Sequence, residues 1–221
     1  MLVRQAEEMG QYGYQAPPPP NVDEIVVKRV FGVMSFLLIF IIPILTMRVY
    51  SEEYRSGTIE LLWTSPVKAE GVLAGKFLAS LVLYAGIIGL SLFYIGVAAL
   101  YTEPGAGPDI GLVFTSSLGM LMLGGTFIAV GIFSSALTEN QIVAAVISFS
   151  ILLFFLVISA AAQYVGSYSA SEFLRYLSLS GHMNGFLSGV LSLRDIVYYL
   201  TFIAFMVFLT NRVIESRRWR T

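Results

Sequence analysis

Residues 142–162 read IVAAVISFSILLFFLVISAAA, an uninterrupted apolar run without a charged residue. A helix needs about 20 consecutive apolar residues to cross the roughly 30 Å hydrocarbon core of a bilayer, so this segment is long enough to span a membrane. Four further runs have the same character: residues 30–47, 77–100, 111–137 and 196–213. Each run is continuously apolar rather than alternating, which favours helices over the strands of a barrel. The sequence therefore predicts an all-α integral membrane protein with five transmembrane helices.

The composition excludes several classes of protein. The 221 residues are 57% hydrophobic and 12% charged, about half the charged fraction of an ordinary soluble domain, and the mean hydropathy is +0.79. The net charge of −1 provides no basic excess for contacts with phosphate groups. These values exclude a soluble enzyme, a disordered tail and a nucleic-acid-binding protein. The sequence has no cysteine, which excludes disulfides and thiolate sites.

The distribution of Lys and Arg predicts the orientation in the membrane, because cytoplasmic loops are enriched in these residues. If five spans alternate in direction, the C-terminal segment and the segment after the first span lie on the same side. That side holds most of the 13 Lys and Arg residues: Arg48, Arg55, Lys68, Lys76, Arg212, Arg217, Arg218 and Arg220. We expect a multi-pass plasma-membrane protein with a cytoplasmic C-terminus. Residues 1–29, with four prolines at 17–20, are expected to form an external loop or tail before a transmembrane domain over residues 30–221.

A short amphipathic helix is predicted over residues 51–65, on the cytoplasmic side. Ser51 is a plausible N-cap and Pro66 marks the end of the helix. Surface helices that bind anionic lipid are usually rich in Lys and Arg. The polar face of this segment, opposite Tyr54 and Leu61, instead combines three acids with one base: Glu52, Glu53, Glu60 and Arg55. The charge pattern favours a protein partner over the alternative, a simple membrane-surface helix.

A second amphipathic segment, residues 172–193, is predicted on the external side. It has two apolar pieces, and Gly181 and Gly185 interrupt the pattern between them. We expect an interfacial or re-entrant helical segment that lies on the membrane surface or dips into it.

The residues offer little catalytic chemistry. The spans contain no Asp, Glu, Lys or His, which proton relays and ion-coupled carriers usually need at membrane depth, so energy for uphill movement should enter from outside the bilayer.

Residues 71–77 resemble a nucleotide-binding loop but lack its spacing, and Phe77 replaces the required Ser or Thr. Lys76 is more simply an interfacial anchor. His182 has no partners for a metal site or a triad and is expected to be a surface or interfacial histidine. We predict no catalytic, metal-binding or cofactor-binding residue.

The third span is rich in small residues. Gly125 with Ala129, and Gly131 with Ser135, are small-xxx-small pairs that permit close helix packing, within one subunit or between two.

The stretch 45–67, LTMRVYSEEYRSGTIELLWTSPV, resembles the signature of type-2 ABC exporter permeases, in the gliding-motility and nitrous-oxide-accessory branch. The matching pattern is Glu53, Gly57-Thr58, Glu60, Leu62 and Pro66, followed by Gly75-Lys76. Residues 185–199, GFLSGVLSLRDIVYY, resemble the segment that enters the last span of this family. The similarity extends from about residue 22 to the end of the chain.

The resemblance implies a permease subunit that works as a dimer, with a second identical or different permease subunit, and with a separate ATPase subunit that binds ATP. The cytoplasmic helix would be a coupling helix that docks on this ATPase. Its implied coupling residues are Glu53, Arg55, Gly57, Thr58, Glu60, Leu62 and Pro66. The chain itself would be neither an enzyme nor a cofactor-binding protein. Members of this family have six spans, so the resemblance also implies that a first span is missing before Met1.

Two classes of function remain open from the sequence. One is the permease of an ATP-driven exporter. The other is a membrane anchor or assembly factor that recruits an ATPase without forming a conduit. An intramembrane enzyme is disfavoured by the residues of the spans, and these apolar spans do not indicate the substrate.

Overall fold

The computed structural model describes residues 22–60, 68–100, 109–161, 164 and 168–218, and every regular element among them is an α-helix. Five helices in this part of the chain are long and apolar enough to cross a membrane, which confirms the predicted class. In chain order the helices are α2 (Val22–Thr46), α3 (Arg48–Ser56), α5 (Ala69–Leu100), α6 (Ile110–Leu137), α7 (Gln141–Ala161), α8 (Tyr168–Leu177), α9 (Leu179–Leu187) and α10 (Leu193–Arg218).

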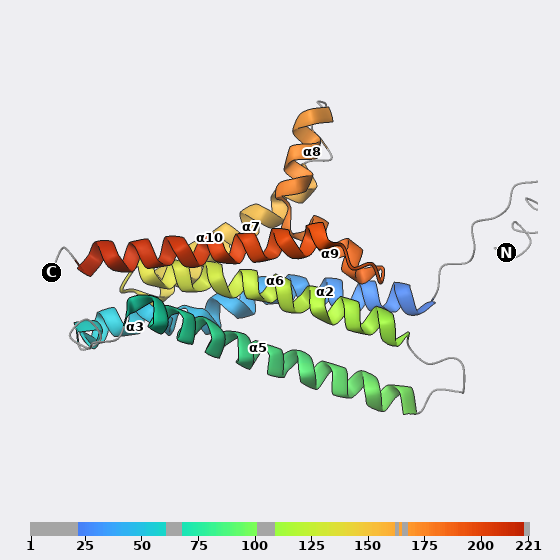
Figure 1. The fold of residues 1–221 in the computed structure, drawn as a ribbon, viewed down its shortest axis with the longest axis horizontal. Helices are drawn as coiled ribbons and strands as arrows, with labels where there is room; N and C mark the ends of the chain where they lie inside the picture. Colours follow the sequence, from blue (N-terminus) through green and yellow to red (C-terminus); the bar gives the residue numbers. More distant parts are fainter. Residues whose placement is uncertain (1–21, 61–67, 101–108, 162–163, 165–167, 219–221) are drawn as a thin grey trace, which may run out of the picture.

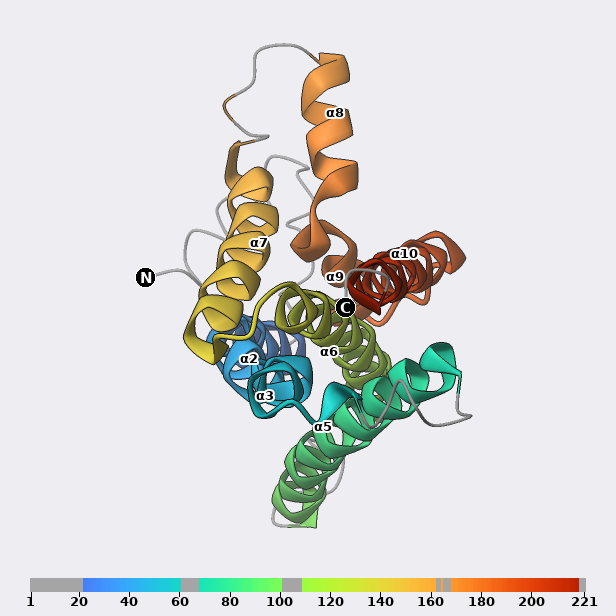
Figure 2. The ribbon, with the colours of Figure 1, turned by 90° about the vertical axis from the view of Figure 1, so that its left-hand side faces the viewer.

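Helix α6 lies at the centre of the bundle, with α2, α5, α7 and α10 around it (Figure 2). Its small residues explain this position, because they let neighbouring helices approach closely. A Cβ atom on Gly124 would lie 2.1 Å from the ring of Tyr84, and one on Gly119 would lie 2.6 Å from the Cβ atom of Phe186. The surrounding helices α5, α7 and α10 expose most of their apolar surface, as expected for residues that face lipid.

Different helices form the two ends of the bundle. Helix α3, the start of α5 and the end of α10 lie at one end, whereas α9 and the start of α2 lie at the other (Figure 1). Helix α3 of the predicted cytoplasmic segment and α9 of the predicted external segment therefore lie toward opposite ends of the molecule, in the order that alternating spans require (Figure 1).

The first span and the short helix after it differ from prediction at their boundaries. Helix α2 begins at Val22 rather than at residue 30, so residues 22–29 are helical instead of forming a loop. Helix α3 begins at Arg48 rather than at Ser51 and ends at Ser56, well before residue 65. Ser51 is not an N-cap: its hydroxyl donates to the carbonyl of Met47, and the residue is buried inside the helix. Helix α3 follows α2 after the single residue Met47, and local capping signals do not reveal this continuation.

The predicted external segment is divided at Ser178 rather than at the two glycines. The Ser178 side chain accepts a hydrogen bond from the backbone N–H of Gly181 and caps α9. Helix α9 packs against α6 with Leu179, Met183 and Phe186 buried. Helix α8 instead projects sideways from the bundle (Figure 1). The segment thus combines a buried helix with a protruding one.

Candidate functional site

Helix α3 is anchored to the central helix through Ser135. The backbone N–H groups of Tyr50 and Ser51 each donate to the Ser135 hydroxyl oxygen at 3.0 Å. The same hydroxyl donates to the carbonyl of Met47 at 2.8 Å. Ser135 is fully buried, so one α6 side chain satisfies three backbone groups at the junction between α2 and α3.

Lys76 joins α3 to α5. Its ammonium nitrogen lies 2.5 Å from a carboxylate oxygen of Glu53 and 2.6 Å from the carbonyl oxygen of Val49. The same group lies 4.0 Å from the ring centroid of Tyr50, a distance at which a cation is attracted to the ring face. The predicted interfacial anchor is therefore also a link between two helices.

The remaining two spans also contact α3. The Gln141 side-chain amide, at the start of α7, donates to the carboxylate of Glu52. The guanidinium of Arg217, near the end of α10, lies 4.5 Å from the ring centroid of Tyr54 and donates to the carbonyl of Leu137 at 2.5 Å. Since α2 leads directly into α3, the short helix is joined to all five candidate spans.

The opposite side of α3 is exposed and polar. Arg55 and Ser56 are exposed there, and so are Thr58 and Glu60 just beyond the helix. Glu52 is exposed as well, although its carboxylate accepts from Gln141 of α7. The hydroxyls of Ser56 and Thr58 are hydrogen-bonded at 2.9 Å. This exposed edge carries acids, a base and hydroxyls that a protein partner can contact.

Gly57 ends α3 in the left-handed conformation, with φ of 72° and its N–H donating to the carbonyl of Tyr54 at 3.3 Å. A Cβ atom there would meet nothing within 4 Å. The requirement for glycine within this chain is therefore conformational, because residues with a side chain rarely adopt a positive φ.

The structure separates the predicted coupling residues into two groups. Glu53 faces the bundle and pairs with Lys76, whereas Arg55, Thr58 and Glu60 are exposed. The sequence pattern had placed Glu53 with the exposed acids. Leu62 and Pro66 lie outside the described residues.

The four predicted packing residues lie buried on α6. A Cβ atom on Gly131 would lie 1.9 Å from the hydroxyl oxygen of Thr46 in α2. Gly125 faces the side chains of Leu81 and Ile203, and Ala129 is 1% exposed. In this chain these residues contact neighbouring helices of the same subunit. The hydrogen bonds of Ser135 were not predicted, because the small-xxx-small pattern indicates only packing.

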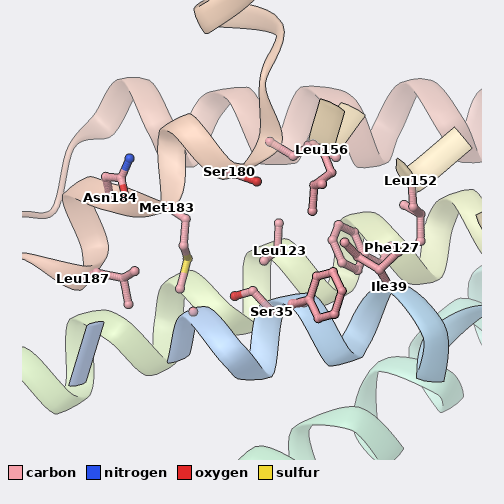
Figure 3. Close-up of a pocket in the computed structure, with 13 residues that line it drawn as sticks. Ser35, Ile39, Leu123, Phe127, Leu152, Leu156, Ser180, Met183, Asn184 and Leu187 are labelled. Atoms are coloured by element: carbon pink, nitrogen blue, oxygen red, sulfur yellow. The ribbon is translucent and has the colours of Figure 1, made fainter. Parts of the chain in front are cut away.

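A cavity of about 170 Å³ lies between α2, α6, α7 and α9. Its side chains converge from all four helices (Figure 3). Most are apolar, and a few polar groups from α2 and α9, Ser35, Ser180 and Asn184, also reach it. The cavity is nearer to α9 than to α3.

His182 is buried, at 6% exposed, and not on the surface as predicted. Its Nδ1 lies 2.6 Å from a carboxylate oxygen of Asp195, and its Nε2 lies 2.9 Å from the carbonyl oxygen of Tyr176. The ring also stacks on Tyr198 with 3.9 Å between centroids. These contacts join α9 to the end of α8 and the start of α10, and long-range pairs of this kind leave no local signal in the sequence. Among the described residues, no group of three or more His, Asp and Glu side chains is arranged to hold a metal ion.

Comparison with known proteins identifies the family. A family model described as ABC-2 family transporter protein matches residues 3–219. Comparison with curated proteins finds no match. The family match covers nearly the whole chain and agrees with the five apolar helices. The chain therefore belongs to the ABC-2 family of transporter proteins, as a membrane component rather than as the ATPase.

Proposed function

We propose that this chain is the permease subunit of an ATP-driven exporter and that α3 is its coupling helix. In this proposal α3 docks on a separate ATPase subunit through its exposed polar edge. ATP binding and hydrolysis in that partner move α3, and the motion reaches the spans through rigid-body displacement. The observation that supports the proposal most directly is the attachment of α3 to α5, α6, α7 and α10 by specific side-chain contacts.

The two sides of α3 have different roles in this proposal. Arg55 and Glu60 are exposed and available to the partner, whereas Glu53 and Ser135 hold α3 to the bundle. Exposed charges at the rim of an interface chiefly affect association rate and specificity. Buried polar contacts cost more to break, because the remaining group loses its partner. Docking and transmission can therefore be impaired separately.

The membrane orientation and the assembly follow from the same proposal. The protein lies in the plasma membrane. The end of the bundle that carries α3 and the end of α10 faces the cytoplasm, because it holds most of the Lys and Arg residues. A second permease subunit covers part of the exposed apolar surface of the spans, and lipid covers the rest. ATP binds to the partner subunit alone. The place of this chain in the gliding-motility and nitrous-oxide-accessory branch is part of the proposal.

The six-span pattern of that branch predicts a further span encoded upstream of Met1. The coding sequence tests this directly: an in-frame apolar segment of about 20 residues is expected. A stop codon immediately upstream, together with a functional five-span protein, would contradict it.

The alternative function is a membrane anchor or assembly factor that recruits an ATPase without forming a conduit. The same docking edge would serve an anchor, but an anchor needs no transmission from α3 to the spans. The alternative therefore predicts that the rate of ATP hydrolysis does not change when the contacts between α3 and the bundle are broken.

The decisive experiment compares two sets of variants in proteoliposomes that contain the permease and its ATPase subunit. The exposed-edge variant Arg55→Ala with Glu60→Ala should weaken co-purification of the ATPase. The bundle-facing variant Glu53→Gln should retain co-purification but lose ATP hydrolysis that depends on the permease. Glu172→Ala, on helix α8, which projects sideways from the bundle (Figure 1), is the control and should change neither. If Glu53→Gln leaves hydrolysis fully coupled and the exposed-edge variant binds normally, α3 is not the coupling helix.

A further inference from the structure

Two hollows meet at one residue on α9. Asn184 lines the apolar cavity between α2, α6, α7 and α9, and it also lines a larger polar pocket of about 510 Å³ at the same end of the bundle. Figure 3 places Asn184 at one side of the cavity, apart from Leu123, Phe127, Leu152 and Leu156. The two hollows are therefore adjoining compartments of opposite polarity.

The inner compartment suits a hydrocarbon chain. Its apolar lining comes chiefly from Ile39, Leu123, Phe127, Leu152, Leu156 and Met183. An apolar cavity of about 150 Å³ binds a small apolar molecule such as benzene, so this hollow of about 170 Å³ has room for the end of an alkyl chain. Burial of apolar surface is the favourable contribution that it offers.

The outer compartment suits a negatively charged group. Arg175 and Arg194 line it, and within the described part of the chain neither guanidinium forms an ion pair. Arg194 lies 5.1 Å from the ring centroid of Tyr176, which fixes its position at the wall. Of the two acids in the lining, Asp195 is engaged by His182 at 2.6 Å, which leaves Glu172 against two arginines. Guanidinium groups bind phosphate and carboxylate through paired hydrogen bonds.

We propose that the two compartments form one site for an anionic amphiphile, with the end of its alkyl chain in the cavity and its phosphate or carboxylate headgroup between Arg175 and Arg194. The buried His182–Asp195 pair holds α9 against α10 and thereby keeps the two compartments next to each other. Helix α9, which lines both compartments, lies at the end of the bundle opposite α3 (Figure 1). The interpretation of this site as a substrate site rests on the proposed transport function. Binding of the amphiphile does not depend on that function.

The chain offers matched variants for each compartment. Gly32 lines the cavity, and a Cβ atom there would meet nothing within 4 Å, so Gly32→Leu introduces a side chain at the cavity wall without a clash at its Cβ atom. Gly89→Leu makes the same change at an equally open position on α5 that does not line the cavity. Arg175→Gln with Arg194→Gln removes the positive charge of the pocket. Arg29→Gln removes a charge at the start of α2, outside the pocket lining.

The test uses the full chain, purified without an ATPase, in phosphatidylcholine nanodiscs with a dodecyl phosphate that carries a photoreactive diazirine at the end of its chain. Cross-links should map to α6 around Leu123 and Phe127. Gly32→Leu should lower labelling at least tenfold, and the double arginine variant should raise the half-saturating concentration at least tenfold. Gly89→Leu and Arg29→Gln should label as the native chain does.

Competition identifies what is recognised. Unlabelled dodecyl phosphate should displace the probe, whereas dodecanol or inorganic phosphate at the same concentration should not. Equal displacement by dodecanol would overturn headgroup recognition, and equal displacement by inorganic phosphate would indicate a free-anion site instead. Labelling that is the same in all variants would indicate bulk lipid and would also overturn the proposal. Because no ATPase is present, failure here leaves the coupling role of α3 untouched, and failure of coupling leaves this binding result valid.

Discussion

The ammonium of Lys76 and the carboxylate of Glu53 lie 2.5 Å apart, and the two side chains are only 19% and 32% exposed, respectively. It links the start of α5 to the bundle-facing side of α3. The acid that the sequence had placed toward a partner protein is thus bound within the chain. The inward and outward faces of α3 can therefore be tested independently.

Lys76→Met should loosen α3 from α5. The change leaves Glu53 without its ion-pair partner and the carbonyl of Val49 without its donor. Breaking a fully buried pair costs about 3–5 kcal/mol, and the partial exposure of this pair places the effect below that range. We expect a lower melting temperature in detergent and less ATP hydrolysis that depends on the permease. Lys68→Met, at an exposed position just before α5, is the matched control, and an equal effect of both variants would contradict the role of the pair.

Ser135→Ala should free the junction between α2 and α3. The backbone N–H groups of Tyr50 and Ser51 would lose their acceptor, and each unsatisfied buried donor costs about 1–3 kcal/mol. Ser134→Ala is a close control, because Ser134 is equally buried but donates only to Val130 within its own helix. Hydrogen exchange at Tyr50 and Ser51 should accelerate in the first variant alone. Unchanged exchange there would show that Ser135 does not hold α3.

Gly57→Ala should destabilise the end of α3. The residue has a φ of 72°, and a side chain in the left-handed conformation costs roughly 1–2 kcal/mol. Gly57→Asn should be tolerated better, because asparagine adopts this conformation more readily. Gly71→Ala is the control, since Gly71 lies within α5 and has open space around it. Coupled ATP hydrolysis should fall for Gly57→Ala and be largely restored in Gly57→Asn. The same activity in all three variants would show that the bend after α3 is not needed.

The class of fold could be predicted from the sequence, but the contacts around α3 could not. Apolar runs such as 142–162 indicate membrane spans because they are long enough to cross the bilayer. They are predicted to be helices because backbone groups inside the bilayer must be paired within each segment. The pairing of Glu53 with Lys76 and the bonds of Ser135 join residues far apart in the chain. Helical periodicity shows which residues share a face, but it does not show which neighbouring helix covers that face. The same reason explains why His182 was expected at the surface and is instead buried against α10.

The orientation of the molecule is tested with single cysteines in this cysteine-free chain. Ser216→Cys lies at the exposed end of α10, and Glu172→Cys lies on the exposed side of α8. The enrichment of Lys and Arg near α3 and the C-terminus places the first inside and the second outside. A membrane-impermeant thiol reagent applied to intact cells should label Glu172→Cys alone. Labelling of Ser216→Cys alone would reverse the orientation.

The most direct measurement of the central claim is photo-cross-linking from α3 to the purified ATPase subunit. A benzophenone amino acid replaces Arg55, on the exposed edge of α3, or Glu172, on helix α8, which projects sideways from the bundle (Figure 1). The proposed coupling role predicts an adduct with the ATPase from position 55, with a yield that changes when ATP is added, and no adduct from position 172. Absence of the adduct at position 55, in a complex that still hydrolyses ATP and is stimulated by the permease, would contradict it.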